Sequence, residues 1–175
     1  MKQFFLIAIA SMFLFNFACT PSSTGGPDAA YVQKIKSAND VIYRALETGD
    51  VSKIDSSFMA ADIVDHGMGP KDVIGIDSVK SYLGMAHSMF SNLKFTVLNE
   101  NIDSVYSTLL VKMTGTATSP GSGFPVGMAV DMNSIDLVKW KDGKAVEHWS
   151  FMDMKDVYKM MPPPPMVTID TVKPH

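Results

Sequence analysis

The sequence predicts an α+β fold in which N-terminal helices pack on one face of a curved antiparallel sheet. Two observations carry this prediction. Apolar residues recur at helical spacing over residues 28–90 and at every second position from Lys94 onward. The pair Asp142-Gly143 then stands between two runs rich in β-branched and aromatic residues, which is typical of a tight β-hairpin.

Length and composition exclude several classes of protein. The 175 residues allow one domain of ordinary size, and 46% hydrophobic against 19% charged residues excludes disorder throughout. The net charge of −3 disfavours a nucleic-acid partner, because phosphate contacts need clustered cations. A single cysteine excludes an internal disulfide and a cysteine-based zinc cluster. No glycine-rich phosphate loop follows a predicted strand, and the histidines match no metal-ligand spacing, so we predict neither cofactor nor metal.

The first 18 residues have the form of a secretory signal peptide. Lys2 precedes an apolar run over 4–15, which is short against the roughly 20 residues that cross a bilayer. We therefore expect this segment to be removed on export rather than to span a membrane.

Cys19 follows the predicted signal peptide directly, and residues 19–30 have the composition of a flexible tether. The arrangement resembles a bacterial lipobox, with Asn16 where a Leu is expected. The resemblance implies that Cys19 is lipidated and anchors the protein in the cell envelope, on the periplasmic or outer-membrane side. The alternative is a secreted protein that carries an unpaired thiol at its tip.

The helices come first in the predicted domain. Apolar side chains at helical spacing predict a helix over 28–48, with Asp28 as its N-cap and Gly49 as its C-cap. A short second helix is predicted over 51–59, and a third over 77–90. Between these two, residues 63–66 are expected to form a short extended segment.

The strands follow, and they predict an antiparallel meander. Period-two runs begin at Lys94 and cover 105–117, 128–140 and 145–152. A closing helix over 154–161 ends at four consecutive prolines, and residues 162–175 are expected to form a tail in polyproline II conformation. The globular domain is thus predicted over 31–161.

Three stretches of the sequence then occur in a familiar order. They are Val64-Asp65-His66-Gly67, the passage 90–97, and the hairpin 135–149 followed by Asp153. With 115–116 and 125–127, they resemble the SnoaL-like polyketide cyclase family of the nuclear transport factor 2-like superfamily. The resemblance covers residues 31–161 and implies a cone-shaped α+β fold, whose bent sheet wraps around helices and encloses an apolar pocket.

The resemblance also implies site residues. In the cyclases a pocket Asp is the general acid/base of an intramolecular aldol closure, and Asp153 matches its position. His66 matches a pocket-lining His. Ala117 and Met128 stand where the family often has His and Arg, and both differences make the pocket less polar.

Strand alternation supports an acidic site near the end of the last predicted strand. Glu147, Trp149, Phe151 and Asp153 share one parity if no bulge intervenes. A carboxyl beside Trp and Phe is desolvated, which raises its pKa toward the pH at which the protein works. A general base is most effective when its pKa is close to that pH. Asp153 and His66 are therefore the candidate catalytic residues.

Simpler structural roles remain open for each of these polar residues. Asp153 would alternatively cap the closing helix, and Glu147 would form an ion pair with Lys139 or Lys144. His66 would either polarise a substrate oxygen or satisfy backbone groups of its turn. By alternation, His148 is expected to face solvent or a partner subunit.

The expected pocket ligand is a hydrophobic small molecule. Methionine is abundant in the chain and suits an adaptable apolar pocket as well as a core. The residues expected to line the pocket are Trp149, Phe151, Met113, Met132 and Phe90.

Three functions fit these sequence features: an acid/base enzyme, a non-catalytic binding module, and an interaction protein. A buried Asp153 opposite His66 favours the enzyme, whereas an Asp153 that only caps a helix favours the other two.

A homodimer through the outer sheet face is also expected, because apolar residues occupy both parities, as in Ile135 and Leu137 against Val138 and Trp140.

The leader generates the first testable prediction. Cys19 is expected to be the first residue of the mature chain and to carry lipid, because it ends the signal sequence and is the chain's only cysteine. Mass spectrometry of the membrane fraction measures this directly. An unmodified chain that starts elsewhere contradicts the prediction.

Overall fold

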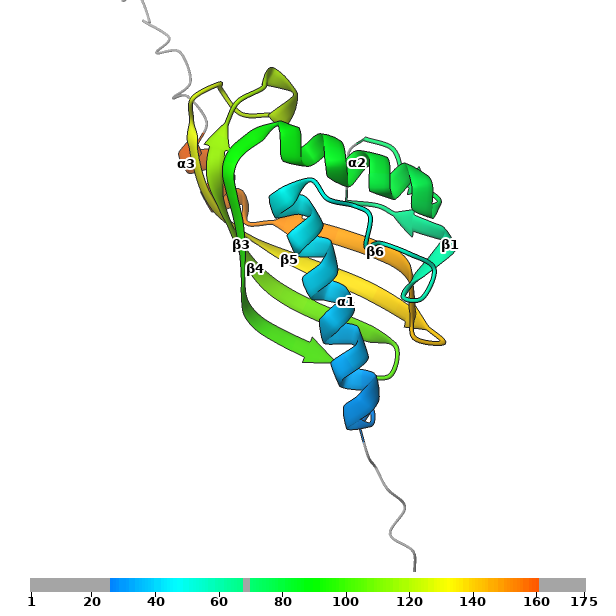
Figure 1. The fold of residues 1–175 in the computed structure, drawn as a ribbon. Helices are drawn as coiled ribbons and strands as arrows, with labels where there is room; N and C mark the ends of the chain where they lie inside the picture. The colour runs from blue at the N-terminus through cyan, green and yellow to red at the C-terminus, as the bar shows by residue number, and fades with distance from the viewer. Residues whose placement is uncertain (1–25, 68–69, 161–175) are drawn as a thin grey trace, which may run out of the picture.

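The computed structural model describes residues 26–67 and 70–160 (Figure 1). The predicted signal peptide, Cys19 and the predicted tail 162–175 lie outside these residues. In the described part, no helix is both long and apolar enough to cross a membrane.

The two long helices form where the sequence predicts them. Helix α1 spans Ala29–Thr48, and the Asp28 carboxylate accepts a hydrogen bond of 2.8 Å from the Tyr31 backbone N–H at its start. Gly49 ends the helix at φ 74°, a left-handed conformation that favours glycine. Helix α2 spans Ile76–Ser88 and buries Val79 and Leu83.

The short helix predicted over 51–59 is wrong. Residues 51–58 form turns, and β1 begins at Met59. The Asp50 carboxylate accepts a hydrogen bond from the Ser52 backbone N–H, and Asp55 does the same for Ser57. Such side-chain bonds to nearby backbone favour turns over a helix.

The strands form one curved, six-stranded sheet in the order β2-β1-β6-β5-β4-β3. All neighbours are antiparallel except β1 and β6, which run parallel. The bounds are β1 Met59–Asp65, β2 Val73–Ile74, β3 Phe90–Ile102, β4 Tyr106–Ala117, β5 Ala129–Lys141 and β6 Lys144–Met152. A 3-10 turn, η1, covers Pro120–Ser122, and the closing helix α3 covers Met154–Met160.

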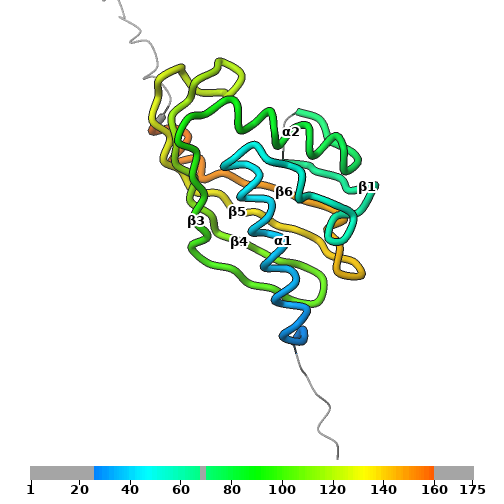
Figure 2. The backbone as a smooth tube through the Cα atoms, in the orientation of Figure 1, coloured from blue at the N-terminus to red at the C-terminus, as the bar shows by residue number. Residues whose placement is uncertain are grey.

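The sheet bends around α1 and α2, which lie on its concave face (Figures 1 and 2). The main core fills the space between them. Its buried members include Ile35 on α1, Leu83 on α2, and Ile63 and Trp140 on the sheet. The predicted α+β architecture is thus confirmed.

The β5–β6 hairpin has the predicted turn, followed by an irregularity that the sequence does not signal. Asp142 and Gly143 have φ values of 53° and 70°, as a type I′ turn requires. Trp140 pairs with Ala145, but the register then shifts, so that Lys139 pairs with Glu147. Val146 is therefore the additional residue of a β-bulge.

The bulge decides which way the rest of β6 faces. Strict alternation from Ala145, which is buried, would direct Glu147 and Trp149 inward as well. The inserted residue reverses this, so His148 and Ser150 face the helices while Trp149 faces the outer surface of the sheet.

A row of apolar side chains crosses this outer surface. Leu110 pairs with Ile135, and Ile135 pairs with Phe151, so the three lie side by side on one face. Their exposed fractions are 38%, 45% and 55%. This row is the part of the sheet through which the homodimer is expected to form.

The homodimer stays a prediction, and the row gives it a test. Ile135→Asp is expected to convert a dimer to a monomer. Residue 135 is the middle one of the row, so the dimer interface would bury one unpaired carboxylate from each subunit. Light scattering at micromolar concentration measures the mass. Ile74→Asp, on exposed strand β2, is the control that should leave the mass unchanged. A monomeric wild type contradicts the prediction.

Candidate active site

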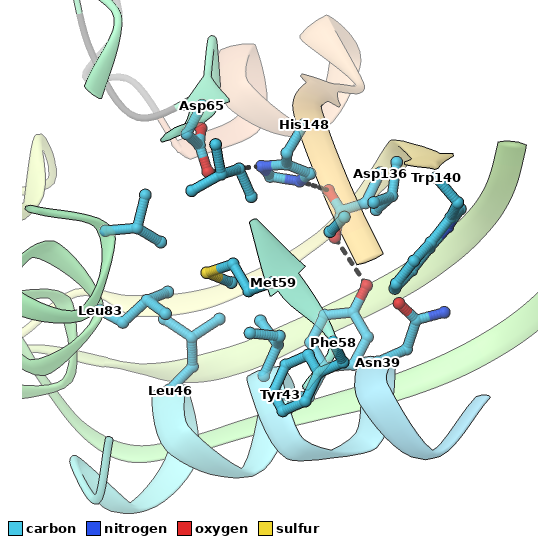
Figure 3. Close-up of a pocket in the computed structure, with 15 residues that line it drawn as sticks. Asn39, Tyr43, Leu46, Phe58, Met59, Asp65, Leu83, Asp136, Trp140 and His148 are labelled. Atoms are coloured by element: carbon cyan, nitrogen blue, oxygen red, sulfur yellow. Dashed lines mark hydrogen bonds and ion pairs between the residues drawn. The ribbon is translucent and has the colours of Figure 1, made fainter. Parts of the chain in front are cut away.

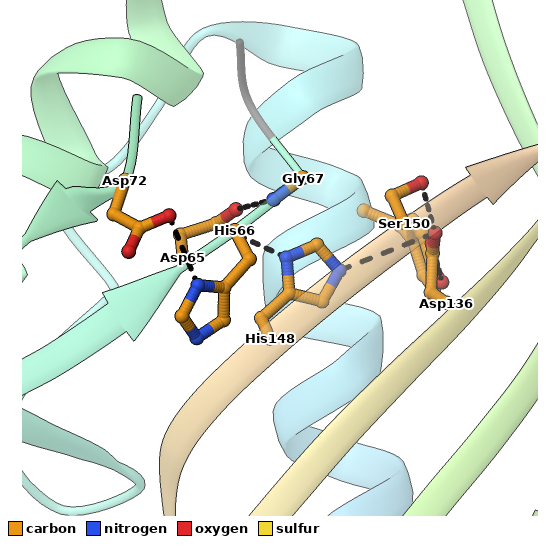
Figure 4. Close-up of polar contacts among 8 residues, drawn as sticks. Asp65, His66, Gly67, Asp72, Asp136, His148 and Ser150 are labelled. Atoms are coloured by element: carbon orange, nitrogen blue, oxygen red, sulfur yellow. Dashed lines mark hydrogen bonds and ion pairs between the residues drawn. The ribbon is translucent and has the colours of Figure 1, made fainter. Parts of the chain in front are cut away.

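The site begins with a buried carboxylate at the end of β1. The Asp65 side chain is almost fully buried, and its Oδ2 lies 2.7 Å from Nδ1 of His148 (Figure 4). Its Oδ1 accepts a hydrogen bond of 2.9 Å from the backbone N–H of Gly67. Asp65 and His148 are register partners in the parallel β1–β6 pair, which fixes this contact.

A second carboxylate faces the other nitrogen of the same imidazole. Nε2 of His148 lies 4.0 Å from Oδ1 of Asp136 on β5. Oδ1 accepts a hydrogen bond of 2.7 Å from the Ser150 hydroxyl, and Oδ2 accepts one of 2.7 Å from the Tyr43 hydroxyl. Asp136 is thus held by two hydroxyl donors and faces His148 at more than hydrogen-bond distance.

The two carboxylates favour the charged imidazole. Burial by itself lowers the pKa of His148, but the hydrogen bond and charge of Asp65, with the charge of Asp136, outweigh it and raise the pKa above its ordinary value. Because a carboxylate only accepts, Nδ1 carries the proton shared with Asp65. Nε2 is therefore the nitrogen left to face Asp136 and the cavities.

Tyr43 is held in its neutral form. Burial first, and then the charge and hydrogen bond of Asp136, raise the pKa of the Tyr43 phenol far above its ordinary value. Tyr43 thus remains a hydrogen-bond donor to Asp136 at any physiological pH.

Two adjoining cavities meet at these polar groups. The smaller has a volume of about 90 Å³ and lies in the main core between α1, α2 and the sheet (Figure 3). The larger, of about 230 Å³, lies toward β3 and the loop that contains Phe124. The side chains that line both are Tyr43, Leu46, Leu83, Asp136 and His148.

The structure places Asp153 outside these cavities, which corrects its predicted position. The residue is exposed, and its Oδ1 accepts a hydrogen bond of 2.8 Å from the backbone N–H of Lys155. Its carbonyl oxygen accepts bonds from Asp156 and Val157. Because β6 ends at Met152, Asp153 is the N-cap of α3, the alternative role that its position allowed.

His66 also lies away from the cavities. As the neighbour of inward-facing Asp65, it faces the outer side of the sheet, where its ring stacks on Trp149 at 4.9 Å between ring centroids. Its Nδ1 lies 3.0 Å from a carboxylate oxygen of Asp72. The expected placement of His66 in the pocket opposite a buried Asp153 is therefore wrong.

The predicted lining residues divide into two groups. Met113, Met132 and Phe90 line the larger cavity. Trp149 and Phe151 do not, because the bulge turns their strand positions to the outer surface. Glu147 likewise points outward and forms an ion pair of 2.6 Å with Lys139, as its structural alternative predicted.

Sequence reasoning missed Asp136 and assigned the wrong face to His148. A signal for Asp136 was present, because it shares strand parity with Val138 and Trp140, which are apolar. No such signal existed for His148, since its orientation depends on the bulge. Among the described residues, no three or more His, Cys, Asp or Glu side chains are grouped so as to hold a metal ion.

Comparison with known proteins identifies the family of this chain. The family model for SnoaL-like polyketide cyclase matches residues 36–160. The chain therefore belongs to the SnoaL-like polyketide cyclase family. No curated protein matches its sequence.

Solved structures share the fold at low sequence identity. A protein from Jannaschia sp. CCS1, described as a candidate SnoaL-like polyketide cyclase, is 19% identical with a TM-score of 0.65, covering 81% of this chain and 99% of its own. TsrD from Streptomyces laurentii is 20% identical with a TM-score of 0.65, covering 77% and 96%. AclR from Streptomyces galilaeus, described as a candidate hydroxylase, is 24% identical with a TM-score of 0.58, covering 78% and 87%. At these identities the likeness shows the nuclear transport factor 2-like fold alone.

The electrostatics of His148 predict how stability depends on pH. A histidine whose pKa is raised on folding stabilises the folded protein. The stabilisation is complete at pH values below the histidine's pKa in the unfolded chain, about 6.5, and it is lost as the pH rises through the pKa in the folded protein. We expect the free energy of unfolding of the wild type to fall over that range, and that of His148→Gln to lack this decrease. Urea unfolding at a series of pH values, with an NMR titration of the imidazole, measures both.

The matched control is His66→Gln, which changes a histidine on the outer face and should retain the decrease. An NMR pKa of His148 at or below about 6.5 contradicts the assignment.

Proposed function

We propose that this protein catalyses proton transfer on a hydrophobic carbonyl compound, of the aldol cyclase or isomerase type. The observation that carries the proposal is the pair formed by His148 and Asp136. An imidazole whose pKa is raised faces a carboxylate across 4.0 Å, at the junction of two cavities whose walls are largely apolar. A titratable group with a perturbed pKa that stands beside a specific charged partner in a cavity is typical of an active site.

The two groups supply complementary steps of enolisation. Asp136 takes a proton from the carbon next to the carbonyl, and the C–H electron pair becomes the C=C bond of the enol. The carbonyl oxygen takes its proton from Nε2 of His148, which leaves a neutral imidazole. One proton has then moved onto the enzyme and one onto the substrate.

The fate of the enol distinguishes the two reaction types. Where the enol is conjugated with a second C=C bond, the proton returns from Asp136 to the far carbon of that bond. The double bond shifts and the enol proton is lost to Nε2, which gives an isomer. In the other route, the enol carbon attacks a second carbonyl carbon, which forms a C–C bond and closes a ring. The π pair of that carbonyl moves to its oxygen, which takes the proton from Asp136, while the enol proton returns to Nε2 and the first C=O bond re-forms. Both routes return His148 and Asp136 to their starting states.

The surrounding residues position this pair. Asp65 fixes the tautomer and orientation of His148, and Tyr43 and Ser150 hold the Asp136 carboxylate at the cavity junction. The apolar walls limit access of water, which strengthens the electrostatic interactions inside the site.

A non-catalytic binding protein is the second candidate. The position of Asp153 favours it, because the acid that the family resemblance implied for catalysis caps a helix instead. The same cavities would then bind an apolar ligand whose polar group accepts a hydrogen bond from His148.

The location of the protein is part of the proposal. Residues 1–18 are proposed to direct export, and lipid on Cys19 to anchor the chain in the cell envelope. This location counts against biosynthetic polyketide cyclisation, which draws on cytoplasmic intermediates, and favours a hydrophobic carbonyl compound met outside the cytoplasm.

Exchange of α-protons tests the proposed chemistry without knowledge of the natural substrate. Alkyl naphthyl ketones in D₂O, followed by NMR, are expected to gain deuterium next to the carbonyl faster when the protein is present. Asp136→Asn and His148→Gln should each lower this rate by about a hundredfold or more, because each removes one partner of the transfer.

Two variants outside the site serve as controls. Asp153→Ala should lose about 1 kcal/mol of stability with its cap but keep the exchange rate, and His66→Gln should also keep it. Ketone binding without accelerated exchange in the wild type would support the binding protein and overturn the enzyme.

A further inference from the structure

We propose that the smaller cavity is a subsite that binds a short apolar group of the ligand and selects ligands by the size of that group. The proposal rests on the proposed function for one point, the placement of the ligand's polar group between His148 and Asp136. The body of the ligand then lies in the larger cavity, and the short group extends past the polar junction into the smaller one.

The smaller cavity is a void in the middle of the main core. Its walls include Ile63, Val79, Trp140 and Ala145, all at most 5% exposed. Protein cores pack densely and contain few voids larger than a water molecule. The volume of about 90 Å³ corresponds to roughly three waters in the liquid. The core therefore leaves room for a group of that volume beside the catalytic pair.

The polar groups of its wall away from the junction have partners elsewhere. Nε1 of Trp140 donates to the Ser107 hydroxyl at 2.9 Å, and Nδ2 of Asn39 donates to Glu100 at 2.9 Å. The ionisable groups of the lining are Asp65, Asp136 and His148 on the sheet, and the Tyr43 hydroxyl that reaches Asp136 from α1 (Figure 3). Because a buried water needs two to four polar partners, the apolar end suits an alkyl group better than water.

The larger cavity has a different character. Its walls include Phe90, Phe124, Met113 and Met132, and methionine adapts to ligands of different shape. The larger cavity is adaptable and the smaller one is rigid, and the polar junction lies between them. This arrangement matches a carbonyl compound with two unequal substituents. The larger substituent is flat or flexible and apolar, and the smaller is a short alkyl group.

A homologous series of ketones tests this assignment by binding alone. Methyl, ethyl and propyl 2-naphthyl ketones are titrated into the purified protein and followed by calorimetry. With the naphthyl ring in the larger cavity, each added methylene enters the smaller one, and affinity for the wild type should rise about fourfold per methylene.

Substitutions in the two cavities locate the effect. Ala145→Leu fills the smaller cavity and should abolish the increase along the series, while the methyl ketone still binds. Ala86→Leu, in the larger cavity, should weaken all three ketones and retain the increase. Val79→Ile is the second small-cavity variant, for use if Ala145→Leu fails to fold, and should also reduce the increase.

The outcomes separate this inference from the proposed chemistry. Equal affinities along the series in the wild type, or an unchanged increase in both small-cavity variants, overturn the subsite and leave a packing void. A rise in affinity along the series without accelerated α-proton exchange keeps the subsite and overturns the proposed enzyme. Accelerated α-proton exchange without a rise in affinity along the series keeps the proposed enzyme and overturns the subsite.

Discussion

The contact between Asp65 and His148 is the interaction on which the rest of this structure depends. A carboxylate that is almost fully buried is costly unless it is paired and hydrogen-bonded. Asp65 meets this condition only with the Gly67 backbone N–H and the His148 imidazole in place. The pair joins β1 to β6 in a fixed register, and the same contact orients Nε2 toward Asp136. One buried ion pair therefore links the assembly of the sheet to the chemistry proposed for the cavity.

The elements that the sequence predicts well are those with local signals. Asp28 and Gly49 mark the ends of α1, and Asp142-Gly143 produces the type I′ turn. These residues determine backbone conformation within a few positions of themselves, so tertiary contacts do not alter the outcome. Residues 51–58 show the opposite case, because their apolar spacing suits a helix while Asp50 and Asp55 bond to the backbone of turns.

The site was predicted poorly for one physical reason, the bulge at Val146. Alternation is a reliable guide to orientation only while the register is continuous, and one inserted residue reverses every later side chain. No glycine or other residue that marks a bulge stands within two positions of Val146. Trp149 and Phe151 were therefore expected inward, and His148 outward. The family resemblance predicted the fold correctly, but a match by motif could not show that Asp153 lies past the end of β6.

The place of β6 in the sheet has a consequence for how the molecule folds. This strand is the last of the described strands along the chain, yet it lies between β1 and β5, and no other pair of described strands runs parallel. Until β6 has been synthesised, β1 and β5 both present open edges, which are prone to pair with other chains. Contacts between residues so distant in the sequence also form slowly. The domain therefore stays incomplete, without a continuous sheet or the approach of His148 to Asp136, until β6 has been synthesised.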